Sequence, residues 1–173
     1  MNLYLVETVG RNRFYHNIFL VRLKAYLIFI FHGGNVIFKL FRKGGVHTMM
    51  KVISTNKAPQ AIGPYSQAIR VDGFLFLSGQ IPLDPKTGSV VDNDIRLQTQ
   101  QVLKNIQGIL DEEDYLLTNI VKTTIFIKDM NDFPVINEEY SQFMQGHNPA
   151  RSTVEVNRLP KDVMIEIEAI AKK

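Results

Sequence analysis

The sequence predicts an α+β domain in which two long helices cover one face of a mixed, mostly antiparallel six-stranded sheet. After Met50, segments with a period of two residues alternate with segments of helical period, in the order β-β-β-α-β-α-β-β. Strands mixed with two long helices are typical of an α+β sandwich, whose helices lie on one face of a largely antiparallel sheet.

Turn signals place the first strands. Residues 68–71 and 74–78 flank Asp72-Gly73, a two-residue link whose chemistry suits a type I′ hairpin turn. Residues 84–88, Asp-Pro-Lys-Thr-Gly, predict a second turn.

Two amphipathic helices follow from the apolar spacing. Residues 94–113 carry apolar residues at helical intervals, with Asp94 and its two predecessors available as caps. Residues 133–144 predict a second helix, whose apolar face is Phe133, Ile136, Tyr140, Phe143 and Met144. Residues 121–128, which lie between these helices, alternate as a strand does.

The last two strands, at 151–156 and 163–170, are expected to pair as an antiparallel hairpin. Pairing their apolar faces, because a slip of one residue would turn every side chain over, brings Arg151 beside Glu166 and Glu168. The polar sheet face that results also carries Thr153. It is too polar for a monomer core and too mixed for plain exposure to solvent, so it predicts self-association with polar pockets at the seams.

Residues 1–49 differ in composition from the rest. They hold seven basic residues and one acid, a charge of +6, so the overall charge of +3 leaves −3 for residues 50–173. Lys43-Gly44-Gly45 can be encoded as a ribosome-binding sequence upstream of Met49 and Met50. We expect residues 1–49 to be a non-native or disordered extension. A basic, aromatic helix at a membrane surface is the alternative.

Composition also limits the chemistry. The chain has no cysteine, which excludes disulfides, thiolate metal sites and cysteine nucleophiles. His147 is the single histidine after residue 49, so clusters of histidines that bind metal are excluded there. The longest apolar run has seven residues, Ala25 to Phe31, and a membrane helix needs about 20. The sequence therefore predicts a cytoplasmic protein with no metal and no membrane partner.

Five motifs in residues 51–173 resemble those of the reactive-intermediate (imine/enamine) deaminase family, the RidA/YjgF type. They are residues 61–68 (AIGPYSQA), 78–82 (SGQIP), 120–124 (IVKTT), 149–156 (PARSTVEV) and 159–169 (LPKDVMIEIEA). The resemblance implies a chorismate-mutase-like fold, a homotrimer with active sites at its subunit interfaces, and no cofactor. It also implies hydrolysis of 2-aminoacrylate, 2-iminobutyrate and 2-iminopropanoate to 2-keto acids and ammonia, which protects pyridoxal-phosphate enzymes.

The resemblance also assigns site residues. Arg151 matches the family's arginine, whose guanidinium fork pairs with the substrate carboxylate. Glu166 matches the glutamate that handles water or protons. Further matches are expected to border the pocket or bind substrate: Tyr65, Ser78, Gly79, Asn137 and Thr153. Thr153 stands where many members have cysteine, and Asp114 stands in a helix end that contains glycine in the family and is therefore expected to be left-handed.

Structural readings of the same residues remain open. Arg151 fits a plain ion pair with Glu166 or Glu168, and a strand glutamate is more often part of a solvated face. A non-catalytic trimer that binds keto or amino acids, as a regulator or chaperone, is the alternative function. An endoribonuclease is a lesser one, because residues 50–173 are acidic and lack a basic patch interleaved with aromatic residues, so no nucleic-acid partner is expected.

Overall fold

The computed structural model describes residues 25–32, 35–42 and 50–173, and the chain divides into two units, Met1–His47 and Thr48–Lys173. In the first unit, β1 (Ala25–His32) and β2 (Asn35–Arg42) pair as an antiparallel ribbon. The alternative of a membrane-surface helix is therefore wrong for these two segments. Most of residues 1–49 lie outside the described residues, so the expectation of a non-native or disordered extension stays a prediction.

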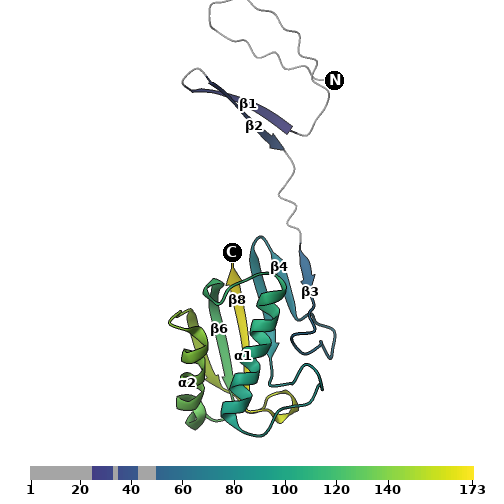
Figure 1. The fold of residues 1–173 in the computed structure, drawn as a ribbon, viewed down its shortest axis with the longest axis vertical. Coiled ribbons are helices and arrows are strands. Elements are labelled where there is room, and N and C mark those ends of the chain that lie inside the picture. The colour runs from purple at the N-terminus through teal and green to yellow at the C-terminus, as the bar shows by residue number, and fades with distance from the viewer. Residues whose placement is uncertain (1–24, 33–34, 43–49) are drawn as a thin grey trace, which may run out of the picture. The chain divides into compact units, whose positions relative to one another are not determined.

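The second unit contains the six-stranded sheet, which confirms the predicted fold class (Figure 1). Its spatial order is β3-β4-β5-β8-β6-β7, and every neighbouring pair is antiparallel except β6 with β7. The strands are β3 (Lys51–Ile53), β4 (Ala68–Val71), β5 (Phe74–Gln80), β6 (Ile120–Ile127), β7 (Ala150–Glu155) and β8 (Ile165–Lys172).

Two helices lie on one face of this sheet, α1 (Ile95–Glu112) and α2 (Phe133–Met144) (Figure 1). Single 3₁₀ turns connect the elements at η1 (Leu117–Asn119), η2 (Met130–Asp132) and η3 (Pro160–Asp162). The core between helices and sheet is made of fully buried aliphatic side chains, among them Leu75, Leu103, Ile106, Ile109, Ile125, Ile165 and Ile167. This packing fixes which face of each strand points toward the helices.

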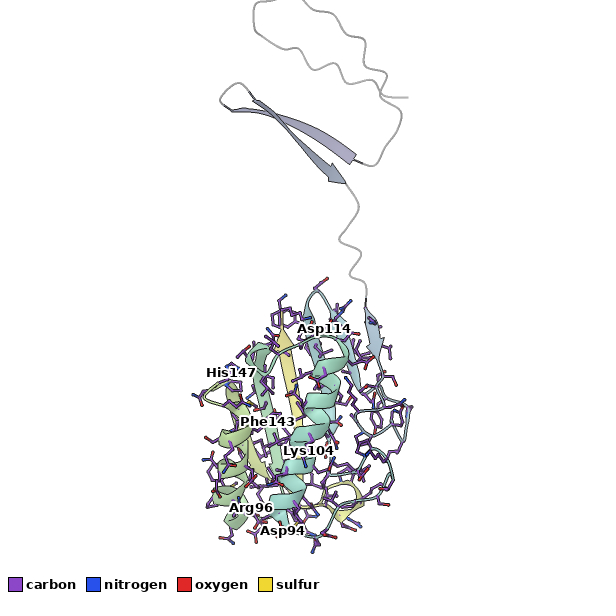
Figure 2. All side chains as sticks on the ribbon, viewed as in Figure 1. Asp94, Arg96, Lys104, Asp114, Phe143 and His147 are labelled. Atoms are coloured by element: carbon purple, nitrogen blue, oxygen red, sulfur yellow. The ribbon has the colours of Figure 1, made fainter. Side chains whose placement is uncertain are left out.

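The turn and cap chemistry is as the sequence predicted. Asp72 and Gly73 both have positive φ, 49° and 73°, as a type I′ turn requires. The Asp94 side chain accepts a hydrogen bond from the backbone N–H of Leu97 at 2.9 Å, which caps α1. Asp114 lies at the other end of α1 (Figure 2). Its φ is 55°. An aspartate thus takes the left-handed position that glycine often fills.

The predicted hairpin between the last two strands is wrong. β7 pairs in parallel with β6, with Arg151 opposite Thr123, while β8 pairs with the other edge of β6. Parallel neighbours need a long crossover, and α2 supplies it between β6 and β7. The assumption of facing apolar sides also fails, because Val154 is 42% exposed. Arg151 is therefore not a neighbour of Glu166 or Glu168 on a shared sheet face.

Among the described residues, no helix has both the length and the apolar character that crossing a membrane demands.

In the second unit, the buried carboxylate of Glu113 pairs with Lys51 of β3 and Arg70 of β4. These ion pairs tie the first two strands of the sheet to the end of α1.

Replacing Asp94 with alanine is expected to lower the free energy of unfolding by about 1 kcal/mol, because one backbone N–H of α1 loses its acceptor. Thermal or urea unfolding measures the difference. Asp94→Ser is the matched control, since a serine hydroxyl also caps the helix. Equal destabilisation by serine and alanine would contradict the assigned cap.

Candidate functional site

Arg151 lies in a pocket between β7 and α2. The pocket has a volume of about 380 Å³ and is lined by Asn137, Tyr140, Ser141, Met144, Asn148, Pro149 and Arg151. We call this the arginine pocket. Its wall combines one cation with three neutral polar side chains and the apolar surface of Tyr140 and Met144. Such a lining suits a small anion that carries an apolar or weakly polar substituent.

Contacts from α2 orient the guanidinium of Arg151. One of its terminal nitrogens donates to Asn137 Oδ1 at 2.9 Å. Its central carbon lies 4.8 Å from the ring centre of Tyr140 and 5.7 Å from that of Phe133. Two cation–π contacts and one hydrogen bond hold the guanidinium against α2, and its other N–H groups can bind a ligand.

Tyr140 links the arginine pocket to strand β6. Its hydroxyl shares a buried hydrogen bond of 2.8 Å with Thr123 Oγ1 on β6. Burial raises the pKa of Tyr140, and the Thr123 hydrogen bond and the charge of Arg151 partly offset this rise. The phenol therefore stays neutral near pH 7. Sequence reasoning placed Tyr140 on the apolar face of the helix and did not predict its contacts in the site. Its spacing of three residues from Asn137, which puts both side chains on one side of α2, could have indicated them.

Thr153 follows Arg151 by two residues on β7, so both side chains point to the helix-covered face. The register agrees, because Thr153 aligns with Ile125, and the side chains of Ile125 and Ile127 are both buried in the core beneath the helices. Thr153 is partly buried but is not among the residues that line the arginine pocket. Arg151, Asn137 and Thr153 thus form one group of the predicted site residues.

The second group of predicted site residues lies at a β-bulge in β5. Between Leu77 and Gln80, β5 has one residue more than its partner β8, and the extra residue falls at Ser78-Gly79. The Glu166 carboxyl occupies the space beside Gly79: a Cβ at residue 79 would lie 2.8 Å from Glu166 Cδ and even closer to Oε1. Glycine at this position therefore makes room for the glutamate, which the sequence did not reveal.

Glu166 is half-buried, and burial, followed by the charge of Glu168, raises its pKa. A carboxyl with a raised pKa holds its proton to higher pH than usual, so it exchanges protons more readily near neutrality. The same shift affects stability. The stability that the buried, protonated Glu166 contributes is fully present below the pKa that this carboxyl has in the unfolded chain. It is lost as the pH rises through the higher pKa that the carboxyl has in the folded protein.

Ser78 and Tyr65 lie close to Gly79. The Ser78 hydroxyl donates to the carbonyl of Ser66 at 2.6 Å, which holds the loop that precedes β4. Tyr65, on that loop, is 49% exposed and borders a small pocket together with Gly79. The Gln67 side chain fixes the same loop by bonding to backbone groups of Thr55 and its neighbours. Tyr65, Ser78, Gly79 and Glu166 thus lie in one region.

The two groups lie on opposite faces of the sheet. Arg151 aligns with Thr123 on the face that the helices cover. Glu166 aligns with Phe126 on the other face. Strand β6 lies between β7 and β8, so a single chain does not bring the guanidinium and the carboxyl together. Within the described residues no group of three His, Asp or Glu side chains is placed to hold a metal ion.

Replacing Gly79 with alanine is expected to push the Glu166 carboxyl toward water and to lower its pKa toward the ordinary value for glutamate. NMR titration of the side-chain carboxyls measures this change. Gly63→Ala is the matched control, because a Cβ at residue 63 meets only the Tyr65 ring at an ordinary 3.6 Å. An unchanged Glu166 pKa in Gly79→Ala would contradict the assigned packing.

Comparison with known proteins agrees with this architecture. A RutC family protein from Pyrococcus horikoshii is 57% identical over 125 residues, covering 72% of this chain and 99% of the relative. A 2-iminobutanoate/2-iminopropanoate deaminase from Salmonella typhimurium is 52% identical over 126 residues, covering 71% and 98%. The crystal structure of E. coli TdcF with bound serine is 46% identical, covers 71% and 98%, and superposes with a TM-score of 0.69.

The family profile described as Endoribonuclease L-PSP matches residues 55–173, which include every strand of the sheet from β4 onward and both helices. All seven predicted site residues fall inside the matched segment. The chain therefore belongs to the endoribonuclease L-PSP family, also called the RidA/YjgF/RutC family.

Proposed function

We propose that the protein hydrolyses 2-imino acids and their 2-enamino tautomers, such as 2-iminobutanoate, 2-iminopropanoate and 2-aminoacrylate, to 2-keto acids and ammonia. The observation that carries the proposal is the arginine pocket, in which a preoriented guanidinium faces a small cavity of mixed polarity. A relative named for this deaminase activity is 52% identical. The proposed role is protection of pyridoxal-phosphate enzymes in the cytoplasm.

Substrate binding follows from the shape of the fork. A planar guanidinium pairs with a carboxylate through two parallel hydrogen bonds, and every 2-imino acid carries a carboxylate next to its C=N carbon. Asn137 and Tyr140 already hold Arg151 in one orientation, so little entropy is lost when the carboxylate binds. The carboxylate then positions the imine carbon for attack.

Hydrolysis needs one water and two proton movements. Water adds to the C=N carbon and one of its protons passes through a base to the nitrogen, which gives a carbinolamine. The proton of the carbinolamine hydroxyl then moves to the nitrogen as the C–N bond breaks, which leaves the C=O group of a keto acid and ammonia. Glu166 suits this exchange because burial raises its pKa. In the proposed reaction Glu166 takes each of these protons from oxygen in turn and passes it to the nitrogen, and no cofactor takes part.

The proposal requires a second copy of the chain, because Arg151 and Glu166 lie on opposite faces of one sheet. The face that carries Glu166 also exposes apolar side chains, with Val52 57%, Phe76 42% and Val154 42% exposed. Such a patch is typical of an interface. A cyclic trimer would place the Glu166 face of one copy against the arginine pocket of the next and so complete three equivalent sites.

The first test generates 2-iminobutanoate with a threonine dehydratase and follows its decay. Arg151→Ala is expected to lower kcat/KM by about 100-fold, because the carboxylate loses its charge-assisted hydrogen bonds. Glu166→Gln is expected to lower kcat. Arg158→Ala is the matched control, since Arg158 pairs with Asp162 at the surface and touches neither group. No acceleration by the wild-type protein would disprove the proposed activity.

The second test co-expresses Arg151→Ala with Glu166→Gln under separate tags. If each site takes the arginine from one copy and the glutamate from another, about a quarter of the interfaces in a randomly mixed assembly combine an intact arginine with an intact glutamate. Imine hydrolysis should then recover to about that share of the wild-type rate. No recovery in mixed assemblies of confirmed composition would contradict the shared site.

A second candidate function is binding of a small ligand without catalysis. A relative has been crystallised with bound serine, and the arginine pocket would serve binding as well as hydrolysis. Binding of 2-oxobutanoate without acceleration of imine decay would favour this function. The family profile carries the name of an endoribonuclease, so RNA is also assayed as a candidate substrate. RNA cleavage that Arg151→Ala retains would not belong to the arginine pocket.

A further inference from the structure

Helix α2 presents different chemistry on opposite sides of a single turn. Asn137 and Tyr140 contact Arg151, and Ser141 lines the same pocket. Glu139 lies about 200° around the helix axis from Asn137, on the side that faces α1. It is only 6% exposed, although a carboxylate is rarely buried unless it is paired.

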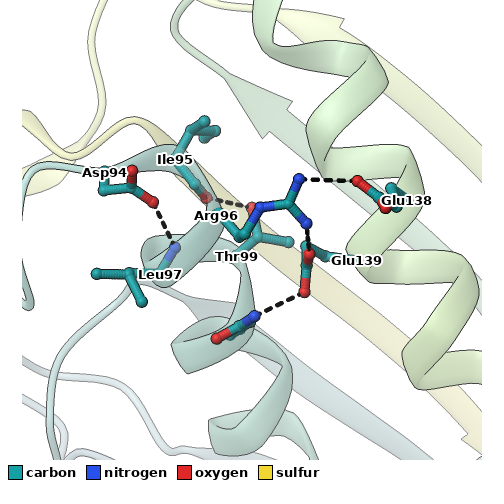
Figure 3. Close-up of polar contacts among 8 residues, drawn as sticks. Asp94, Ile95, Arg96, Leu97, Thr99, Glu138 and Glu139 are labelled. Atoms are coloured by element: carbon teal, nitrogen blue, oxygen red, sulfur yellow. Dashed lines mark hydrogen bonds and ion pairs between the residues drawn. The ribbon is translucent and has the colours of Figure 1, made fainter.

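Arg96 at the start of α1 compensates this buried charge (Figure 3). One terminal nitrogen of its guanidinium donates to Glu139 Oε1, and the other donates to Glu138 Oε2 at 2.8 Å. Gln100, one turn further along α1, donates to Glu139 Oε2 at 2.8 Å. Each Glu139 oxygen therefore has a donor from α1, and the arginine bridges two consecutive residues of α2.

We propose that Arg96 is a positioning residue for the arginine pocket: by neutralising Glu139 it holds the turn of α2 that carries Asn137 and Tyr140, and through them the guanidinium of Arg151. This inference rests on the proposed function. Arg96 acts on the opposite side of the helix from the pocket, so its effect on the substrate passes through α2.

The physical reason is the cost of an unpaired buried charge. Without Arg96, the buried carboxylate of Glu139 loses its cationic partner, which is far more unfavourable than the absence of both groups. The protein relieves this cost by turning α2 so that Glu139 reaches water. Because a helix turn moves as a unit, Asn137 and Tyr140 move with it, and Arg151 loses its hydrogen bond and its cation–π contact.

Steady-state kinetics with 2-iminobutanoate tests the inference in the full-length chain. Arg96→Ala is expected to raise KM by about tenfold with kcat changed less than about twofold, because the carboxylate clamp acts equally on substrate and transition state. The double variant Arg96→Ala/Glu139→Gln is expected to restore KM to within about threefold of wild type, since the neutral amide stays buried and still bonds to Gln100. Arg158→Ala, which loses a different ion pair, is the control.

The rescue separates positioning from other roles. A lower melting temperature in Arg96→Ala with unchanged KM would reduce Arg96 to a structural residue and overturn the inference. A raised KM that Glu139→Gln fails to rescue would show that the buried charge is not the cause, and would overturn it as well.

Calorimetric affinity for 2-oxobutanoate, measured on the same variants, is independent of turnover. Weaker binding in Arg96→Ala that the double variant restores would support the inference even in a protein that does not hydrolyse imines, in which case the proposed function alone fails. A wild-type protein that neither binds 2-oxobutanoate nor hydrolyses the imine would overturn both.

Discussion

The pairing of β6 with β7 on one edge and with β8 on the other organises this protein. Because β6 lies between β7 and β8, its alternating side chains define both faces in this part of the sheet: Thr123 and Ile125 point toward the helices, and Phe126 points away. Every residue of β7 and β8 takes its direction from this register. Arg151 therefore lies on the helix-covered face and Glu166 on the other, and no rotamer change brings them together across a hydrogen-bonded sheet.

Helix α2 carries the consequences of this register to the site. Its ends are tied to β6 and β7, because it is the crossover between them. One side holds Arg151 by a hydrogen bond and two aromatic rings, and the other side is held to α1 by charges. Within the described residues, every buried side-chain nitrogen and oxygen has a hydrogen-bond partner. A polar network with all partners satisfied fixes one geometry more strictly than apolar packing does.

Much of the local structure could be predicted from the sequence. The Asp72-Gly73 turn and the cap at Asp94 follow from preferences of single residues, both helices follow from apolar periodicity, and the left-handed Asp114 follows from the family resemblance. The pairing of the last strands could not. A short connection between two strands favours a hairpin, and only the position of α2 shows that β7 instead returns beside β6. The predicted adjacency of Arg151 and Glu166 was wrong for the same reason, because it depended on that hairpin.

For residues 50–173, the amino-acid sequence by itself determined the helices and strands, the α+β class and the chemistry available: without cysteine, and with a single histidine after residue 49, the site draws on arginine, glutamate, amide and hydroxyl groups. Only the tertiary structure decided which groups meet. It grouped Arg151 with Asn137 and Tyr140, placed Glu166 beside Gly79 and put Arg96 against Glu139. Residue preferences act over a few positions of the chain, whereas strand order and helix docking depend on burying the whole core at once.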